Sequence, residues 1–142
     1  MITCSKIIEF DSAHRVFSNE KSKCEKLHGH RYKAEITLQR YINNLDNNGM
    51  VFDFTEIKKL IKTWIDINWD HNVILSNKDK QLAIDIEKNT GQKVYFVENP
   101  TAEILAKELF NICNAILNKF QVKCIEVKIF ETPTSYAIYN QK

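Results

Sequence analysis

Two stretches near the N-terminus alternate between apolar and polar side chains, which is typical of strands with one buried face. The first stretch, residues 2–16, carries His14 at the end of its buried stripe, and the second, residues 28–41, begins with His28 and His30. The predicted buried positions are Ile2, Cys4, Ile8, Phe10, Ser12 and His14, broken by Lys6, and then His28, His30, Tyr32, Ala34, Ile36 and Leu38. In an antiparallel hairpin the end of the first strand lies beside the start of the second. The pattern therefore predicts that His14 approaches His28 and His30.

Two later segments have the helical period. Asp53 is a good N-cap, and Glu56 three residues on completes a capping-box-like start. We expect a second helix to open at Asn99 and Pro100, with the proline at the first helical position. The predicted apolar faces are Ile57, Leu60, Ile61, Trp64 and Ile65 in the first helix and Leu105, Leu109, Ile112, Ile116 and Phe120 in the second.

A short irregular or helical stretch and a short strand are expected between the helices, and a hairpin of residues 122–131 and 134–139, turned around Thr132 and Pro133, is expected after them. The chain, 1–142, is thus predicted to be a single α+β domain, a four-stranded antiparallel sheet with two helices on one face in the order β-β-α-α-β-β. Such a sheet leaves its edges exposed, and closure into a barrel would remove them.

Composition excludes several classes of protein. A hydrophobic content of 44% and a charged content of 27% are ordinary for a globular core, and a net charge of +2 gives no reason to expect nucleic acid as a partner. The sequence has no 18-residue apolar run, so we expect no membrane span. Its four cysteines lack a disulfide-like spacing and no signal peptide precedes the first strand. We therefore expect a cytoplasmic protein.

All four histidines lie in three short motifs, and three of them belong to the two predicted buried stripes. Alternate side chains of a strand share a face, so His28 and His30 can reach one ion, and Gly29 between them suits a close backbone approach. Three imidazoles with an open position indicate a catalytic Zn2+ site, although imidazole also suits Cu, Ni and Fe. With Cys24 as a fourth ligand the site would instead be structural, and the histidines could also be core or surface residues without a metal.

Two further groups are candidates for proton transfer. Cys24 lies in a polar loop whose lysines would favour its thiolate form, although it could be an ordinary loop cysteine. Asp70 precedes His71 at the end of a helical stretch, and a carboxylate beside an imidazole can set its tautomer and basicity. The alternative for this pair is an exposed helix end.

Glu131 continues the alternating stripe of Ile125, Val127 and Ile129, so its carboxylate is predicted to point to the buried side. A buried carboxylate needs partners, and a ligand with adjacent N–H groups, such as a guanidine-like ring edge, would supply them. If the strand ends earlier, Glu131 is solvated.

These residues resemble a known family. Cys24 to His30, CEKLHGH, is similar to the CxxxHGH motif of the 6-pyruvoyltetrahydropterin synthase / 6-carboxytetrahydropterin synthase family. The resemblance extends in order through FDSAHR (10–15), GMVFDF (49–54), DH (70–71), NPTAE (99–103) and FETPTS (130–135), and so covers nearly the whole chain.

The resemblance implies zinc on His14, His28 and His30, and Cys24 as the general base with Asp70 and His71 as relay partners. It implies that Glu131 anchors a pterin ring, with Thr101 and Glu103 nearby. It also implies the tunnelling fold (T-fold), in which subunits join sheets as a trimer or hexamer and the active sites lie between subunits.

The three-residue gap between Cys24 and His28 is similar to that of the bacterial queuosine-pathway branch. That branch converts 7,8-dihydroneopterin triphosphate to 6-carboxy-5,6,7,8-tetrahydropterin with release of acetaldehyde and triphosphate. Glu25 resembles the glutamate with which some members cleave the dihydroneopterin side chain to 6-hydroxymethyl-dihydropterin for folate synthesis. A 6-pyruvoyltetrahydropterin synthase and, outside the enzymes, a zinc-stabilised binding module stay open as alternatives.

Overall fold

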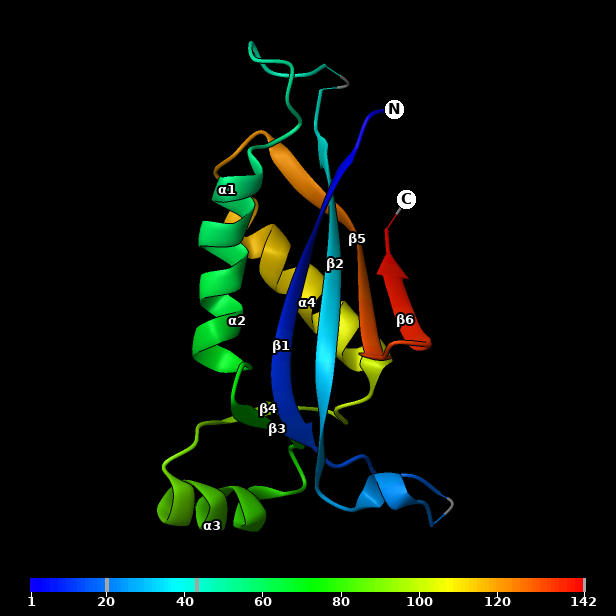
Figure 1. Cartoon of the computed structure of the whole chain (residues 1–142), viewed down its shortest axis with the longest axis vertical. Coiled ribbons are helices and arrows are strands. Elements are labelled where there is room, and N and C mark those ends of the chain that lie inside the picture. Colours follow the sequence, from blue (N-terminus) through cyan, green and yellow to red (C-terminus); the bar gives the residue numbers. More distant parts are fainter. Residues whose placement is uncertain (20, 43, 142) are drawn as a thin grey trace.

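The computed structural model describes residues 1–19, 21–42 and 44–141. Its strands are β1 (Cys4–His14), β2 (His28–Arg40), β3 (Asn72–Ser76), β4 (Val94–Val97), β5 (Val122–Thr132) and β6 (Ser135–Asn140). Its helices are a 3-10 turn η1 (Lys23–Glu25), a run of α1 (Phe54–Ile57), the π-helical turn η2 (Lys58–Lys62) and α2 (Thr63–Asn68), then α3 (Lys80–Thr90) and α4 (Ala102–Leu117). Figure 1 shows β1, β2, β5 and β6 standing together, with α4 behind them and α1 and α2 to one side.

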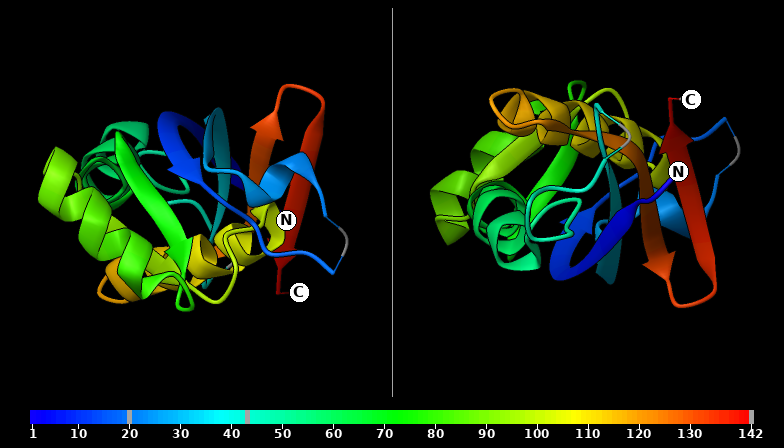
Figure 2. Two further views of the ribbon diagram at one scale, coloured as in Figure 1. Left: turned by 90° about the horizontal axis from the view of Figure 1, so that it is seen from below. Right: turned by 90° about the horizontal axis from the view of Figure 1, so that it is seen from above.

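The strands form one sheet in the order β4-β3-β1-β2-β5-β6. The predicted hairpin is confirmed, because β1 and β2 pair antiparallel with His14 opposite His28 and Ser12 opposite His30. The final hairpin of β5 and β6 is confirmed as well. Seen end-on, the helices gather on one side of a curved sheet (Figure 2). The α+β class therefore holds.

The prediction of four antiparallel strands is wrong, since the sheet has six strands. The strand β3 runs parallel to β1, and β4 runs parallel to β3. The strand β3 escaped detection because Val73, Ile74 and Leu75 are all buried and so do not alternate. Ile74 faces the main core, whereas Val73 and Leu75 pack with α3. The stretch expected to be irregular or helical is the helix α3, and it covers β3 and β4 at one corner of the sheet.

Two element boundaries also differ from expectation. The helix α4 begins after Thr101, whose hydroxyl caps the N–H of Ile104, so Pro100 precedes the cap instead of occupying the first helical position. In β5 the register shifts opposite Thr37 and Leu38, which makes Ile125 the extra residue of a bulge. Asp53 does cap the first helix, through the N–H of Thr55 at 2.6 Å.

The main core lies between the sheet and the helices, and its centre is aromatic. Phe10 and Tyr32 are fully buried and stack with ring centroids 5.1 Å apart, and Trp69 packs on Phe10 at 5.6 Å. These contacts join the hairpin to the end of α2. They also support the strand positions immediately before the histidines.

Three strand edges stay open within the described residues. The strands β4 and β6 form the two ends of the sheet, and β3 covers β1 only at Ser12–His14, which leaves positions 4–11 of β1 with one unpaired edge. Within the same residues no helix is both long and apolar enough to cross a membrane.

The core predicts a large effect for one substitution. Phe10→Ala should lower the free energy of unfolding by about 3–5 kcal/mol, because it removes a fully buried ring and leaves a cavity against Tyr32 and Trp69. Urea denaturation followed by tryptophan fluorescence measures the change. Phe54→Ala, at a side chain that is 54% exposed, is the matched control and should change little. Equal losses in the two variants would contradict this description of the core.

Candidate active site

The three histidines predicted to meet do so at one end of the β1–β2 hairpin. The Nε2 atom of His28 lies 3.2 Å from that of His14 and 3.0 Å from that of His30. Nitrogen ligands about 2.0–2.1 Å from a tetrahedral zinc ion are roughly 3.3 Å apart. The spacing of the imidazoles therefore matches the edge of such a coordination shell.

The hydrogen bonds of the Nδ1 atoms identify the tautomers of His14 and His28. Nδ1 of His14 lies 2.8 Å from the carbonyl oxygen of Pro100, and Nδ1 of His28 lies 2.6 Å from that of Lys26. A carbonyl oxygen can only accept, so both Nδ1 atoms donate and, in the neutral rings, both Nε2 atoms carry lone pairs. Two lone pairs that face each other at 3.2 Å need a cation between them, so the donor set fits a metal ion.

Burial keeps the deepest ligand neutral. His14 is almost fully buried, and burial lowers its pKa to about 4. Burial also lowers the pKa of His30, although the Glu131 carboxylate opposes that shift. The hydroxyl of Tyr32 lies 3.0 Å from Nδ1 of His14, and burial raises the pKa of this phenol, so it stays protonated. Neutral imidazoles are the form that binds metal.

Gly29 suits the close pairing of the strands. A Cβ atom at this position would lie 3.3 Å from the carbonyl oxygen of Ser12, which is tighter than ordinary contact. The predicted close backbone approach is therefore confirmed, and it lies directly between His28 and His30.

A cavity of about 260 Å³ opens beside His14 and contains most of the other candidates. Cys24, Thr101, Glu103 and Glu131 all line it. The carboxylate of Glu131 lies 3.7 Å from Nε2 of His30 and is 28% exposed, so the predicted inward direction is confirmed. The cavity thus combines a thiol, a hydroxyl and two carboxylates next to the imidazole cluster.

Cys24 is exposed in the turn η1, which extends beyond the paired ends of β1 and β2 (Figure 1). Its N–H donates to Oγ of Ser22, and its carbonyl accepts from the N–H of Val16. Among the described residues its sulfur is not part of the cluster in which the three histidine nitrogens lie within 4.8 Å of one another. The thiol therefore lies outside the histidine cluster and lines the neighbouring cavity.

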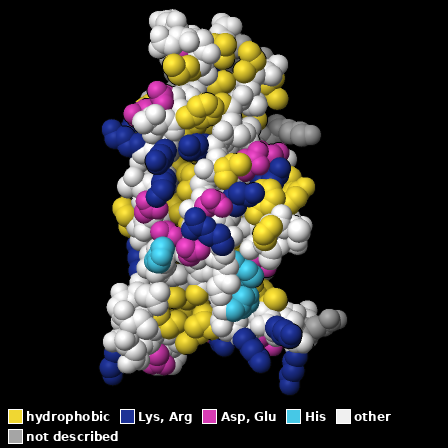
Figure 3. All heavy atoms as spheres, in the orientation of Figure 1, with side chains coloured by type: hydrophobic (Ala, Val, Ile, Leu, Met, Phe, Trp, Pro, Cys, Tyr) yellow, Lys and Arg dark blue, Asp and Glu magenta, His cyan; other side chains and the backbone are white. Residues whose placement is uncertain are grey.

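Asp70 and His71 lie elsewhere. Oδ2 of Asp70 is 2.9 Å from Nδ1 of His71, and Oδ1 of the same carboxylate accepts from the N–H of Asp11, on the outward face of β1. His71 lines a different cavity with Asp11 and Arg31, and that cavity shares no described lining residue with the one beside Cys24. In Figure 3 histidine atoms accordingly appear at two separate places on the surface. One chain does not bring Cys24 and His71 together.

The backbone of His71 is held in an unusual conformation. Its φ of 57° is the one positive value at a non-glycine residue in the described part of the chain. The N–H of His71 donates to the carbonyl of Asp11 at 2.7 Å, and its own carbonyl accepts from the Gln92 side chain at 3.1 Å. Strained backbone that surrounding contacts maintain is a feature of functional sites.

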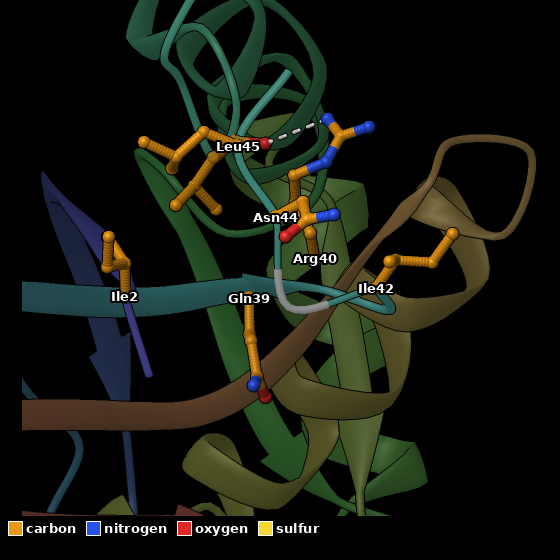
Figure 4. A pocket seen from close by; sticks show the side chains of 7 residues that line it. Ile2, Gln39, Arg40, Ile42, Asn44 and Leu45 are labelled. Atoms are coloured by element: carbon orange, nitrogen blue, oxygen red, sulfur yellow. Dashed lines mark hydrogen bonds between the residues drawn. The ribbon is translucent and has the colours of Figure 1, made fainter.

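Glu25 does not line the cavity beside Cys24. Its charge acts instead on Arg15, whose pKa is raised mainly by the hydrogen bond to Asp79 and further by Glu25. The pocket at the opposite end of the hairpin, about 20 Å³, has room for one water molecule. Figure 4 shows Arg40 there, donating to the carbonyl of Val51. Neither feature adds a group to the histidine site.

Sequence reasoning missed three contributors to the site. Tyr32 looked like a core residue, the Pro100 carbonyl is a backbone group, and Gln92 is a single polar residue of a loop. Of these three, only Pro100 could have been found from the sequence, because it lies in the NPTAE segment (99–103) that resembles the family.

Three imidazoles that could bind a metal ion, beside an open cavity with a thiol and carboxylates, fit the class of metal-binding enzymes. The comparisons agree with this description. The chain matches the sequence profile of 6-pyruvoyl tetrahydropterin synthase over residues 3–142. It therefore belongs to the 6-pyruvoyl tetrahydropterin synthase family.

Curated relatives share much of the sequence. The chain is 45% identical over 138 residues to the 6-carboxy-5,6,7,8-tetrahydropterin synthase of Rickettsia bellii, covering 96% of this chain and 98% of that protein. It is 50% identical over 112 residues to the enzyme of the same name from Rickettsia typhi, covering 78% and 79%.

Solved structures share the fold. The Caenorhabditis elegans 6-pyruvoyl tetrahydropterin synthase superposes with a TM-score of 0.69 at 25% identity, over 99% of this chain and 96% of that one. An uncharacterised protein of Wolinella succinogenes superposes with a TM-score of 0.82 at 24% identity, over 99% and 98%. The first of these supports the T-fold for this chain.

The Asp70–His71 pair yields a prediction about pH. The hydrogen bond and charge of Asp70 raise the pKa of His71, so Asp70→Asn should lower that pKa toward the ordinary value of about 6.5. Because the pKa is raised on folding, the pair stabilises the fold below the ordinary pKa and loses this contribution as pH rises through the raised one. NMR titration of the imidazole measures the shift. The control is Asp66→Asn, which removes an ion pair with Lys62 and should leave the pKa of His71 unchanged. An unaltered titration of His71 in Asp70→Asn would refute the conclusion that Asp70 raises this pKa.

Proposed function

We propose that this protein is a 6-carboxy-5,6,7,8-tetrahydropterin synthase, which converts 7,8-dihydroneopterin triphosphate to 6-carboxy-5,6,7,8-tetrahydropterin with release of acetaldehyde and triphosphate. The names of the Rickettsia relatives support this reaction. The structural observation that carries it is one cavity in which Cys24 and Glu131 line the same space as His14. We place the reaction in queuosine biosynthesis in the cytoplasm.

His14, His28 and His30 are the proposed ligands of a Zn2+ ion, supported by their facing nitrogens. A zinc ion bound there would act as a Lewis acid that lowers the pKa of substrate side-chain oxygens. The carbonyls of Pro100 and Lys26 hold two of the rings in the ligating tautomer. The protein thereby orients its ligands before a metal arrives.

Glu131 is the proposed anchor of the pterin ring. Its carboxylate can accept two N–H bonds from the guanidine-like edge of the ring, a charge-assisted pairing that fixes orientation. Thr101 and Glu103 lie in the same cavity and are proposed to contact the ring as well. The Thr101 oxygen already accepts from the N–H of Ile104, so its hydroxyl proton is available to a ligand.

Cys24 is the proposed general base, taking a proton from the carbon or hydroxyl next to the ring. His71, oriented by Asp70, is the proposed partner that donates or relays protons. Because Cys24 and His71 line separate cavities of one chain, we infer that they meet across a subunit boundary. The open edges of β1 and β6 support such an assembly, since pairing them between copies would close the sheet as a trimer, and two trimers would give a hexamer.

The reaction is tested by product mass. Zinc-loaded protein incubated with 7,8-dihydroneopterin triphosphate should give 6-carboxytetrahydropterin and acetaldehyde, whereas Cys24→Ala should stay folded and zinc-loaded and form at least about 100-fold less product. Loss of zinc from Cys24→Ala would favour a structural site with a sulfur ligand. A 6-hydroxymethyl-dihydropterin or 6-pyruvoyl product would replace the proposed reaction with folate-type cleavage or with pyruvoyl synthesis.

The shared site is tested by complementation. Cys24→Ala and His71→Ala should each be inactive alone, but an equal mixture, unfolded and refolded together, should recover about a quarter of wild-type activity, because a quarter of randomly formed interfaces join an intact Cys24 to an intact His71. Refolding each variant separately before mixing is the control. No recovery from co-refolded chains of normal oligomeric size would place both groups in one subunit.

A further inference from the structure

The loop between β1 and β2, which carries Cys24, is held near its start by a side chain from a distant part of the sequence. Oδ1 of Asn99 accepts from the N–H of Phe17 at 3.0 Å, and Nδ2 of Asn99 donates to the carbonyl of Phe17 at 2.9 Å. Both polar groups of the amide thus pair with both backbone groups of one residue, as a neighbouring strand would. Such a two-point contact restrains orientation as well as distance.

The contact continues from Phe17 to the backbone of Cys24. Val16, the neighbour of Phe17, donates its N–H to the carbonyl of Cys24 at 2.8 Å. On the other side Arg15 donates from Nε to Asp79 at 2.8 Å, and Asp79 is buried. Residues 15–17 are therefore held at two points, by Asp79 at Arg15 and by Asn99 at Phe17, and they contact the turn η1 through Val16.

The same short segment also supports the rest of the cavity. The carbonyl of Pro100 accepts from Nδ1 of His14, and Thr101 and Glu103 line the cavity. Asn99 is thus adjacent to the residues that hold one proposed metal ligand and one wall of the substrate site. A displacement of the loop relative to residues 99–103 would move Cys24 relative to both.

We propose that Asn99 is a positioning residue, which sets where the Cys24 thiol lies relative to His14 and to the substrate cavity. The inference rests on the proposed function, in which Cys24 is the general base. Asn99 itself touches neither the proposed ligands nor the cavity, so its effect passes through Phe17, Val16 and the Cys24 backbone. Small displacements of a reacting group are costly, because proton transfer needs hydrogen-bond reach.

The chain offers a matched control. Asn114 makes the same two-point contact with a different residue, accepting from the N–H of Cys124 at 3.0 Å and donating to its carbonyl at 3.1 Å. It lies on α4, 11 residues after Glu103, and lines no described part of the Cys24 cavity. Asn114→Ala therefore removes an equivalent contact without touching the loop.

The experiment compares Asn99→Ala with Asn114→Ala in the full-length, zinc-loaded protein. In Asn99→Ala we expect kcat to fall roughly 10- to 100-fold with zinc content retained, and backbone hydrogen exchange in residues 15–27 to accelerate. In Asn114→Ala we expect a lower melting temperature with wild-type kcat and unchanged exchange in that loop. Asn99→Asp turns a carboxylate oxygen toward the Phe17 carbonyl, so it should also lower kcat and accelerate exchange in the loop, and it serves as the test if the alanine variant does not fold.

Three results would overturn the proposal: equal kcat values for the two alanine variants, equal exchange in residues 15–27, or a loss of activity that follows only the loss of zinc. If wild-type protein forms no pterin product, the proposed function fails. The exchange comparison then still decides whether Asn99 anchors the loop, because it does not depend on turnover.

Discussion

The pairing of β1 with β2 is the constraint on which the rest of the site depends. Opposite partners in this hairpin are His14 with His28 and Ser12 with His30, so a slip of one residue would turn the imidazoles to different faces. The pairing is held by buried aromatic contacts next to the histidines, where Phe10 stacks on Tyr32. It is also permitted by Gly29, because a side chain there would press on the Ser12 carbonyl. Core packing and the geometry of the histidine cluster therefore depend on the same strand pairing.

Around that hairpin, the histidines are oriented by hydrogen bonds to backbone carbonyls. Carbonyls of Pro100 and Lys26 set the tautomers of two histidines, and the carbonyl of Asp11 holds His71 in its left-handed conformation. The Asp11 carbonyl belongs to β1, the Pro100 carbonyl lies just before α4, and the Lys26 carbonyl ends the turn η1. An acceptor held by the backbone orients a ring at little entropic cost. The site is preorganised by secondary structure more than by a polar network.

The distribution of the proton-transfer groups relates function to assembly. Cys24 and Glu131 lie on the helix side of the sheet, whereas Asp70 and His71 lie near Asp11 on the outward side. The open strand edges and the separation of Cys24 from His71 are the two observations on which the proposed shared site rests. Pairing of the open edges between copies would satisfy the unpaired backbone groups and could bring the separated proton-transfer groups together.

The sequence alone determined the hairpin, the convergence of the three histidines and the inward direction of Glu131, because strand periodicity and antiparallel pairing depend only on local pattern and register. It also identified Cys24 and the Asp70–His71 pair as candidates, largely through their resemblance to a family. It predicted one short strand between the helices but not β3, because Val73, Ile74 and Leu75 are all buried and lose their alternation, and it did not reveal the bulge at Ile125. Tertiary structure decided that the Asp70–His71 pair lies apart from Cys24, and that Asn99 and Pro100 support the site from 82 and 86 residues away from their partners. Contacts of that kind depend on the packing of whole elements, which no local pattern in the sequence encodes.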